Sequence, residues 1–245
     1  MLPTPHPRPI LVHAAEAARL VDAGAVILDS RGRLDFLSGH LPGAQRVDWR
    51  IGVTGSLRTG ALGPPALAAH DFAALGVDAA RPVLVVGAWA HGWGEEGRIA
   101  WDLLYLGHSD VYVLRGGVEA WPGSLDHLPR AATPGVFEPS VRPELRVDRA
   151  HLGEGGTLLL DVREPDEFAG ARLYGEARGG HVPGARSLPW KHLLDTVPDL
   201  PPGPVVTMCT GGVRSALAWV ILRDAGYSVS HYDAGWWEWS SEVAP

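Results

Sequence analysis

The 245-residue chain contains a single cysteine, Cys209. One cysteine excludes an intramolecular disulfide and any metal site built from cysteines alone. No apolar run approaches the length of a membrane-spanning helix, and the proline-rich residues 1–9 lack the apolar segment of a signal peptide. We therefore expect a cytoplasmic protein that does not engage a membrane.

Clusters of basic residues are also missing, and the formal net charge is −7. A nucleic-acid partner is not expected, because such proteins carry a basic patch or stripe. The histidines show no His-Glu-x-x-His or similar ligand spacing, so neither a metal site nor a cofactor is expected. The remaining classes are enzymes and binding proteins that act on small molecules or on other proteins.

Several short motifs occur twice, in the same order. The repeated motifs, each given with its second copy, are an apolar strand ending in Asp-x-Arg at 25–31 and 157–163, Gly-His-x-Pro-Gly at 39–43 and 180–184, and a buried strand at 83–86 and 205–208. We interpret the chain as two copies of one α/β unit, residues 1–125 and 146–245, joined by a polar, proline-rich linker at 126–145.

The order of the elements predicts the fold. Apolar strands alternate with helix-like segments, for which the sequence predicts helices over 10–24, 65–75, 97–107 and from Ser215 onward. Strands that are apolar throughout are typical of a mainly parallel sheet with helices on both faces. In such sheets the functional site lies at the carboxyl ends of the strands.

Cys209 stands where a strand, 205–208, meets a helix. The connecting loop reads Cys209-Thr-Gly-Gly-Val-Arg214. A loop that enters a helix points backbone N–H groups inward, and the helix dipole adds partial positive charge. Glycines permit the backbone angles that such a cradle needs. The loop is therefore suited to holding an anion or a thiolate, and Cys209 is the expected nucleophile.

Taken together, these motifs resemble those of two-domain rhodanese-type sulfurtransferases, the group of thiosulfate and 3-mercaptopyruvate sulfurtransferases. The resemblance rests on both Asp-x-Arg and both Gly-His-x-Pro-Gly motifs, Leu-Arg-Gly-Gly117, the Cys209 loop and the ending 232–240. It implies two rhodanese-like domains of which only the second is catalytic. In the alignment of the two copies Trp89 stands in place of the cysteine, so the first domain is expected to be inactive.

The resemblance also implies a two-step reaction. Cys209 takes a sulfane sulfur from thiosulfate or a similar anionic donor, and cyanide or a thiol, including a protein thiol, removes it from the persulfide. The substrate-binding residues expected in the loop are Thr210, Gly211, Gly212, Val213 and Arg214. The better-known two-domain members usually have Thr or Ser where Arg214 stands. A 3-mercaptopyruvate donor and a persulfide carrier therefore remain alternatives.

Outside the loop, four residues are candidates for the site. Asp161 and Arg163 are expected to form a structural ion pair, because the first copy keeps the same motif without a nucleophile. Many two-domain members carry a substrate-binding arginine shortly after this motif, where the present chain has the acidic Asp166-Glu-Phe168. Arg172 and Arg178 lie in an insertion, 171–180, that the first copy lacks, and both are candidate substrate contacts, with Arg178 the preferred one.

Two other interpretations of the motifs are weaker. Residues 92–97 match the Gly-x-Gly-x-x-Gly pattern of dinucleotide-binding loops, but the repeat aligns this segment with the cysteine loop and it carries two glutamates. Cysteine-dependent phosphatases and arsenate reductases need Cys-x5-Arg for a tetrahedral oxyanion. The present spacing from Cys209 to Arg214 is Cys-x4-Arg, which fits a single sulfur atom better.

Overall fold

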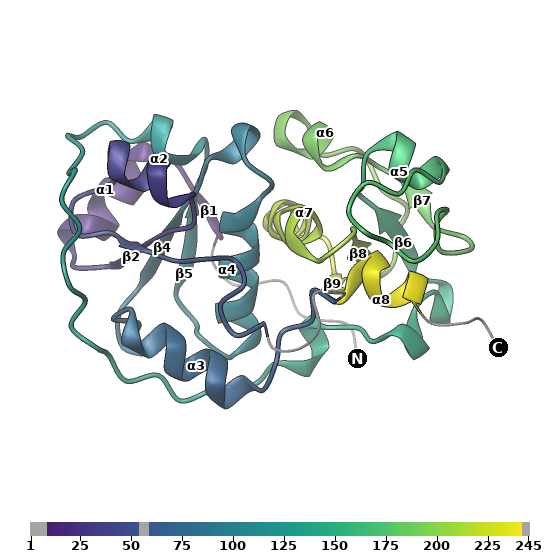
Figure 1. Cartoon of the computed structure of the whole chain (residues 1–245), viewed down its shortest axis with the longest axis horizontal. Coiled ribbons are helices and arrows are strands. Elements are labelled where there is room, and N and C mark those ends of the chain that lie inside the picture. Colours follow the sequence, from purple (N-terminus) through teal and green to yellow (C-terminus); the bar gives the residue numbers. More distant parts are fainter. Residues whose placement is uncertain (1–8, 54–58, 242–245) are drawn as a thin grey trace.

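The computed structural model describes residues 9–53 and 59–241. Its α/β fold contains two sheets, one in each half of the chain (Figure 1). The strand order is β1-β5-β4-β2-β3 in the first sheet and β7-β6-β8-β9 in the second, and every pair of neighbouring strands is parallel. The predicted pair of parallel α/β units is confirmed.

The elements of the two halves follow one another in a similar order. The first half contains β1 (Leu11–Val12), α1 (Ala14–Asp22), β2 (Val26–Asp29), α2 (Arg33–Ser38), β3 (Gln45–Arg46), α3 (Pro65–Ala74), β4 (Val83–Val86), α4 (Glu95–Tyr105) and β5 (Val111–Leu114). The second contains β6 (Leu158–Asp161), α5 (Pro165–Ala169), β7 (Arg186–Ser187), α6 (Trp190–Asp195), β8 (Val205–Met208), α7 (Val213–Asp224), β9 (Val229–His231) and α8 (Gly235–Ser241).

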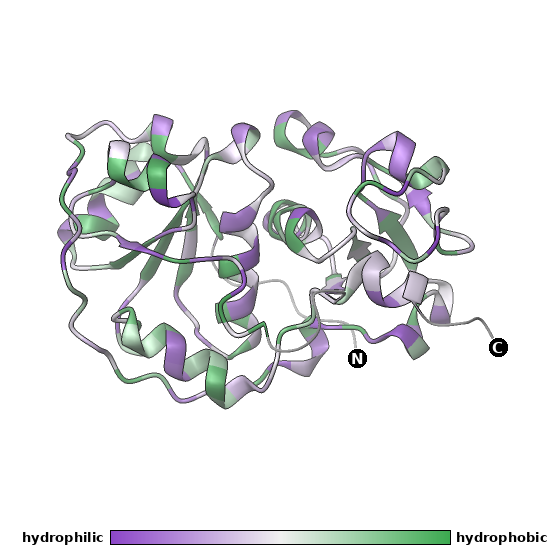
Figure 2. Ribbon diagram, in the orientation of Figure 1, coloured by the Kyte–Doolittle hydropathy of each residue, from purple (hydrophilic) through white to green (hydrophobic). Residues whose placement is uncertain are grey.

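Both faces of the central strands are buried, which is why these strands are apolar throughout (Figure 2). In the first sheet, Val26 and Leu28 of β2 pack toward α3 and α4, whereas Ile27 packs toward α1 and α2. In the second sheet, Leu160 faces α6 and α7, and Leu159 faces α8. Alternate residues therefore anchor helices on opposite faces of each sheet.

Helices α4 and α7 pack against each other between the two sheets, and one apolar core runs through both halves. A Cβ on Gly97 would lie 2.3 Å from Cα of Leu217, and one on Gly94 would lie 2.9 Å from its Cβ. These two glycines of the 92–97 pattern therefore permit a close approach of two helices. Their packing role removes the need for a bound dinucleotide to explain them.

The prediction of one helix over 10–24 is wrong at its start. Leu11–Val12 forms strand β1, which extends the edge of the first sheet by pairing with β5, and the helix begins only at Ala14. Pairing with a distant strand overrides the local helical pattern. The second sheet has no matching strand among the described residues. Only an isolated bridge from Arg146 to His231 occupies that edge.

The strand register corrects the alignment of the two copies. Strand β4 ends at Val86 opposite the last residue of β2, and β8 ends at Met208 opposite the last residue of β6. The next residue is Gly87 in the first copy and Cys209 in the second. Gly87, rather than Trp89, is therefore the counterpart of the cysteine. The first copy still lacks a thiol at this position.

Residues 126–145, expected to be a linker, lie along the outside of the first half (Figure 1). Asp126 forms an antiparallel bridge with His40, and the buried side chains of Phe137 and Leu145 belong to the main core. The segment is thus attached to the first half at several points, including hydrogen bonds from Gly135 N–H to Ala73 O of α3 and from Arg142 N–H to Tyr105 O of α4. Within the described ranges, no helix is long and apolar enough to cross a bilayer.

Candidate active site

Cys209 lies at the carboxyl end of β8, one turn before α7 begins at Val213. Helix α7 therefore starts two residues earlier than the sequence predicts. The loop is tied to the start of α8, because the N–H of Trp236 donates to the carbonyl oxygen of Cys209 at 2.8 Å and that of Trp237 donates to Thr210 O at 3.0 Å. The equivalent bond in the first copy runs from Val118 N–H to the oxygen of Gly87 at 3.0 Å.

The loop leaves three backbone donors without an acceptor at the N-terminus of α7. Among the described residues, no oxygen accepts a hydrogen bond from the backbone N–H of Thr210, Gly211 or Gly212. Gly212 has φ +78°, and a Cβ there would lie 2.3 Å from the carbonyl oxygen of Asp233. Only glycine fits this conformation and this contact. The free N–H groups and the helix dipole together favour an anion at this point.

Cys209 opens into a pocket of about 330 Å³ between the two halves. Both halves supply its walls: Trp49, Arg50, Trp93 and Glu95 come from the first, and Tyr174, Cys209, Thr210, Gly211, Val213, Arg214 and Trp237 come from the second. Only 1% of Cys209 is exposed, so its sulfur is reached through this pocket. The degenerate first half therefore has a direct part in forming the site.

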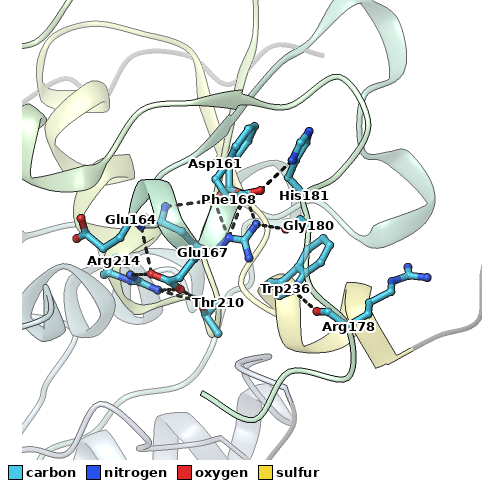
Figure 3. A network of polar contacts seen from close by, with 11 residues as sticks. Asp161, Glu164, Glu167, Phe168, Arg178, Gly180, His181, Thr210, Arg214 and Trp236 are labelled. Carbon is cyan, nitrogen blue, oxygen red and sulfur yellow. Dashed lines mark hydrogen bonds and ion pairs between the residues drawn. The ribbon is translucent and has the colours of Figure 1, made fainter. Parts of the chain in front are cut away.

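Arg214 is bound to a carboxylate of its own half (Figure 3). Its Nη1 donates to Oε2 of Glu167 at 2.6 Å and its Nη2 donates to Oε1 at 2.8 Å. Thr210 joins the pair, since its hydroxyl donates to Glu167 Oε1 at 2.7 Å and accepts from Arg214 Nη2 at 2.8 Å. The side chains of Thr210 and Arg214 are thus held by a buried carboxylate beside the pocket.

The ionisation of this pair follows from its surroundings. Burial raises the pKa of Glu167, but the hydrogen bonds and charge of Arg214 outweigh burial, so the pKa lies below its ordinary value. Burial lowers the pKa of Arg214, whereas Glu167 and Cys209 raise it, and the net shift is upward. Both partners are therefore charged at neutral pH. Much of the positive charge of the loop arginine is neutralised within the protein.

The position of Glu167 can be recognised in the sequence from the residue that follows it. Phe168 stacks on His181 with centroids 3.8 Å apart, and Phe36 stacks on His40 at the same distance. The two phenylalanines are therefore equivalent, and an acidic residue precedes each of them. Only the second copy also carries the loop arginine, so its acid, Glu167, is available as a partner for Arg214.

Asp161 and Arg163 form a buried ion pair, with Nη2 of Arg163 2.6 Å from Oδ2 of Asp161. Arg163 also donates to the carbonyl oxygen of Gly180 at 2.8 Å. The first copy has the same arrangement: Arg31 binds Asp29 and the carbonyl oxygen of Gly39. Neither Asp161 nor Arg163 lines the pocket. Because the pair occurs in both copies, its contribution is to hold the loop that contains the Gly-His-x-Pro-Gly motif.

Arg178 does not line the pocket. Its Nη2 donates to the carbonyl oxygen of Trp239 at 3.0 Å, and its own carbonyl oxygen accepts from the indole of Trp236. Of the C-terminal tryptophans, Trp237 lines the pocket, whereas Trp236 is buried and does not. Arg172 also lies outside the pocket lining, and the insertion 171–180 reaches the pocket through Tyr174 instead.

Two buried residues behind the loop have no motif of their own. The hydroxyl of Ser215 donates to Sγ of Cys209 at 3.3 Å and lies 2.8 Å from Nε2 of His231. Across the described part of the chain, no group of three or more His, Cys, Asp or Glu side chains is arranged to hold a metal ion.

A tandem pair of parallel α/β units, with one cysteine loop between a strand and a helix, defines the class of this protein. The family model described as "Rhodanese-like domain" matches residues 13–123 and 149–242. The chain therefore belongs to the rhodanese family. Apart from β1, the two matched regions contain the strands of the two sheets and their helices.

Several known proteins are similar over most of the chain. The thiosulfate sulfurtransferase of Corynebacterium glutamicum is 30% identical over 97% of this chain and 89% of its own length. The sulfur carrier protein TtuD of Thermus thermophilus is 27% identical over 84% of each chain. Among solved structures, SseA of Escherichia coli, a 3-mercaptopyruvate sulfurtransferase, has a TM-score of 0.78 at 23% identity and covers 94% of this chain and 99% of its own.

Proposed function

We propose that the protein is a sulfurtransferase that moves a sulfane sulfur from thiosulfate, or a similar anionic donor, to cyanide or a thiol through a persulfide on Cys209. The observation that carries this proposal is the only thiol of the chain at the base of a pocket, beside unpaired backbone N–H groups at a helix N-terminus. The thiosulfate sulfurtransferase of Corynebacterium glutamicum, similar over nearly the whole chain, supports it.

The chemistry needs one nucleophile. The Cys209 thiolate attacks the outer sulfur of thiosulfate, the sulfur–sulfur bond of the donor breaks, and sulfite leaves with the bonding electrons. An acceptor then attacks the outer sulfur of the persulfide and regenerates the thiolate. We infer that the N–H groups of Thr210, Gly211 and Gly212, which have no acceptor among the described residues, stabilise the negative charge of both the thiolate and the persulfide.

Arg50 is our candidate for the cation that attracts the donor. Among the described residues, the pocket lining contains two cations, and Arg214 is held by the buried Glu167. The side chain of Arg50 is 59% exposed, stacks on Trp49 and lies 3.8 Å from the exposed Asp48. A solvent-exposed pair of this kind is weak and gives way to a stronger anionic partner.

The donor is tested by a panel of thiosulfate, 3-mercaptopyruvate and glutathione persulfide, each with cyanide as the acceptor. We expect turnover with thiosulfate to exceed turnover with the other two. A clear preference for 3-mercaptopyruvate would replace thiosulfate as the donor. Hydrolysis of p-nitrophenyl phosphate that depends on Cys209 would overturn sulfur transfer in favour of phosphatase chemistry, which the engagement of Arg214 by Glu167 argues against.

A persulfide carrier is the second candidate function, and one observation favours it. Exposed apolar side chains stand at the mouth of the pocket and beside it: Trp93, Leu173 and Tyr174. The sulfur carrier protein TtuD is among the relatives similar over most of the chain. Faster transfer of sulfur to protein thiols than to cyanide would select this function. The need for a reduced thiol fits a cytoplasmic location.

A further inference from the structure

A chain of three buried polar side chains ends at the sulfur of Cys209. Ser215, in the first turn of α7, donates to Sγ at 3.3 Å, and its oxygen lies 2.8 Å from Nε2 of His231 at the end of β9. Both Ser215 and His231 are fully buried. Among the described residues, Ser215 is the only hydrogen-bond partner of the His231 ring, since Nδ1 has none. The contact between Ser215 and His231 is thus the ring's single polar anchor.

The number of hydrogens determines the direction of these bonds. A serine hydroxyl has one hydrogen to donate, and a thiolate only accepts. When Cys209 is ionised, the Ser215 hydrogen must therefore point at Sγ. The remaining bond, between Ser215 and His231, must then be donated by the ring, which requires the neutral tautomer with its hydrogen on Nε2.

The surroundings of His231 keep its ring neutral. Burial, together with the charges of Arg98 and Arg146, holds the pKa of His231 well below its usual range. Each of these cations is paired with a carboxylate: Arg98 lies 2.9 Å from Asp102, and Arg146 lies 2.9 Å from Asp233. The ring of Trp101 packs edge-on against the imidazole at 4.6 Å between centroids. His231 can therefore act as a fixed donor, and it is a poor acceptor of the cysteine's proton.

We propose that Ser215 and His231 are positioning residues for Cys209: His231 fixes the orientation of the Ser215 hydroxyl, and Ser215 donates its hydrogen to the thiolate sulfur. A hydrogen bond to an ionised acceptor is stronger than one between neutral groups. The pair thus favours the thiolate form of Cys209, because the Ser215 hydroxyl adds a side-chain donor to the backbone N–H groups of the loop. This inference rests on the proposal that Cys209 is the nucleophile.

The test measures the rate at which iodoacetamide alkylates the protein as a function of pH. The chain has one cysteine, so alkylation of a thiol, followed by mass spectrometry, reports Cys209 alone. We expect Ser215→Ala to move the midpoint of this profile to higher pH by about one unit, the size expected for losing a hydrogen bond to a charged acceptor. An unchanged midpoint in a folded Ser215→Ala protein would overturn the proposal.

Three further variants separate positioning from packing. His231→Leu removes the ring's donor and should move the midpoint in the same direction, whereas His231→Gln keeps an N–H at a similar reach and should restore the wild-type value. Equal midpoints for these two variants would contradict the role of His231. Thr207→Val is the matched control. It removes a fully buried hydroxyl that donates to the Ser215 carbonyl oxygen and not to sulfur, and it should leave the midpoint unchanged.

A measurement on the unmodified protein avoids any folding defect of the variants. Nitrogen-15 NMR of the imidazole, recorded above the alkylation midpoint, should show neutral His231 with its hydrogen on Nε2. A hydrogen on Nδ1 would overturn the proposed direction of the bonds. Both readouts are independent of sulfur transfer. Failure of the proposed function would appear instead as persistent sulfur transfer in a protein that lacks Cys209.

Discussion

Arg214 and Glu167 form a bidentate ion pair beside Cys209, with N–O distances of 2.6 and 2.8 Å, and almost no part of either side chain reaches solvent. The arginine of the cysteine loop is thereby a structural partner of helix α5. Its positive charge still lies near the sulfur, but Nη1 and Nη2 each already donate a hydrogen bond to Glu167. We therefore propose that recognition of an anionic donor depends mainly on the loop N–H groups and on Arg50.

Replacing Arg214 with alanine is expected to lower stability. The substitution leaves the Glu167 carboxylate buried without its partner, a situation that costs about 3–5 kcal/mol of unfolding free energy. Chemical denaturation of Arg214→Ala measures this loss. The double variant Glu167→Gln with Arg214→Met removes both charges and should recover part of it. Wild-type stability in Arg214→Ala would show that the pair is not formed as described.

Replacing Arg50 with alanine is expected to affect binding rather than stability. Its side chain is largely exposed at the pocket, so the KM for thiosulfate should rise about tenfold while kcat stays close to the wild-type value. Arg46→Ala is the matched control, because Arg46 also faces Asp48 but does not line this pocket. Equal KM values for the two variants would remove Arg50 from donor recognition.

Gly212 is expected to tolerate no side chain. With φ at +78° and the Asp233 oxygen 2.3 Å from where a Cβ would stand, Gly212→Ala must shift the loop. We expect a loss of unfolding free energy of about 2–3 kcal/mol and a large fall in kcat/KM. Gly184→Ala tests the backbone angle alone, since Gly184 has φ +81° with nothing within 4 Å of a Cβ. That change should cost about 1 kcal/mol and leave the activity unchanged.

Glu96, in the first turn of α4, is expected to make stability depend on pH. Burial raises its pKa to about 8, above the value of 4.5 that applies to an unfolded chain. The folded protein then holds a proton that the unfolded chain releases, so stability decreases as pH rises from 4.5 to about 8.

Glu96→Gln carries no such proton. Its unfolding free energy should exceed that of the wild type by on the order of 3 kcal/mol at pH 7, and the difference should shrink toward pH 5. Denaturation curves at several pH values measure this difference. The same substitution at the exposed Glu138 should produce no such trend. A constant difference between Glu96→Gln and the wild type at every pH would contradict the assignment.

The sequence was sufficient to predict the fold, because the repeated motifs and fully apolar strands specify two parallel sheets. The local sequence pattern gave a wrong prediction where contacts with a distant segment determine the structure. Residues 11–12 resemble the start of a helix, yet they pair with β5. The alignment that put Trp89 opposite Cys209 was miscounted: Gly87 follows 83–86 as Cys209 follows 205–208, and the strand register agrees. Gly94 and Gly97 matched a nucleotide motif, and the packing of α4 on α7 explains them.

For the site, sequence reasoning identified the loop but not its surroundings. Cys209 follows a strand and precedes glycines, a local pattern that can be recognised from one segment. Glu167, Ser215 and His231 reach the loop from separate elements, and Arg50 comes from the other half of the chain. No spacing rule connects these residues, because their proximity depends on how the sheets and helices pack.

The most direct test of the account is the mass of the intact protein after exposure to thiosulfate. We expect the wild type to gain the mass of one sulfur atom and to lose it again when cyanide is added. Cys209→Ala should stay folded, gain nothing and show no sulfur transfer. A sulfur adduct on Cys209→Ala, or thiocyanate formation by that variant at the wild-type rate, would contradict a Cys209 persulfide.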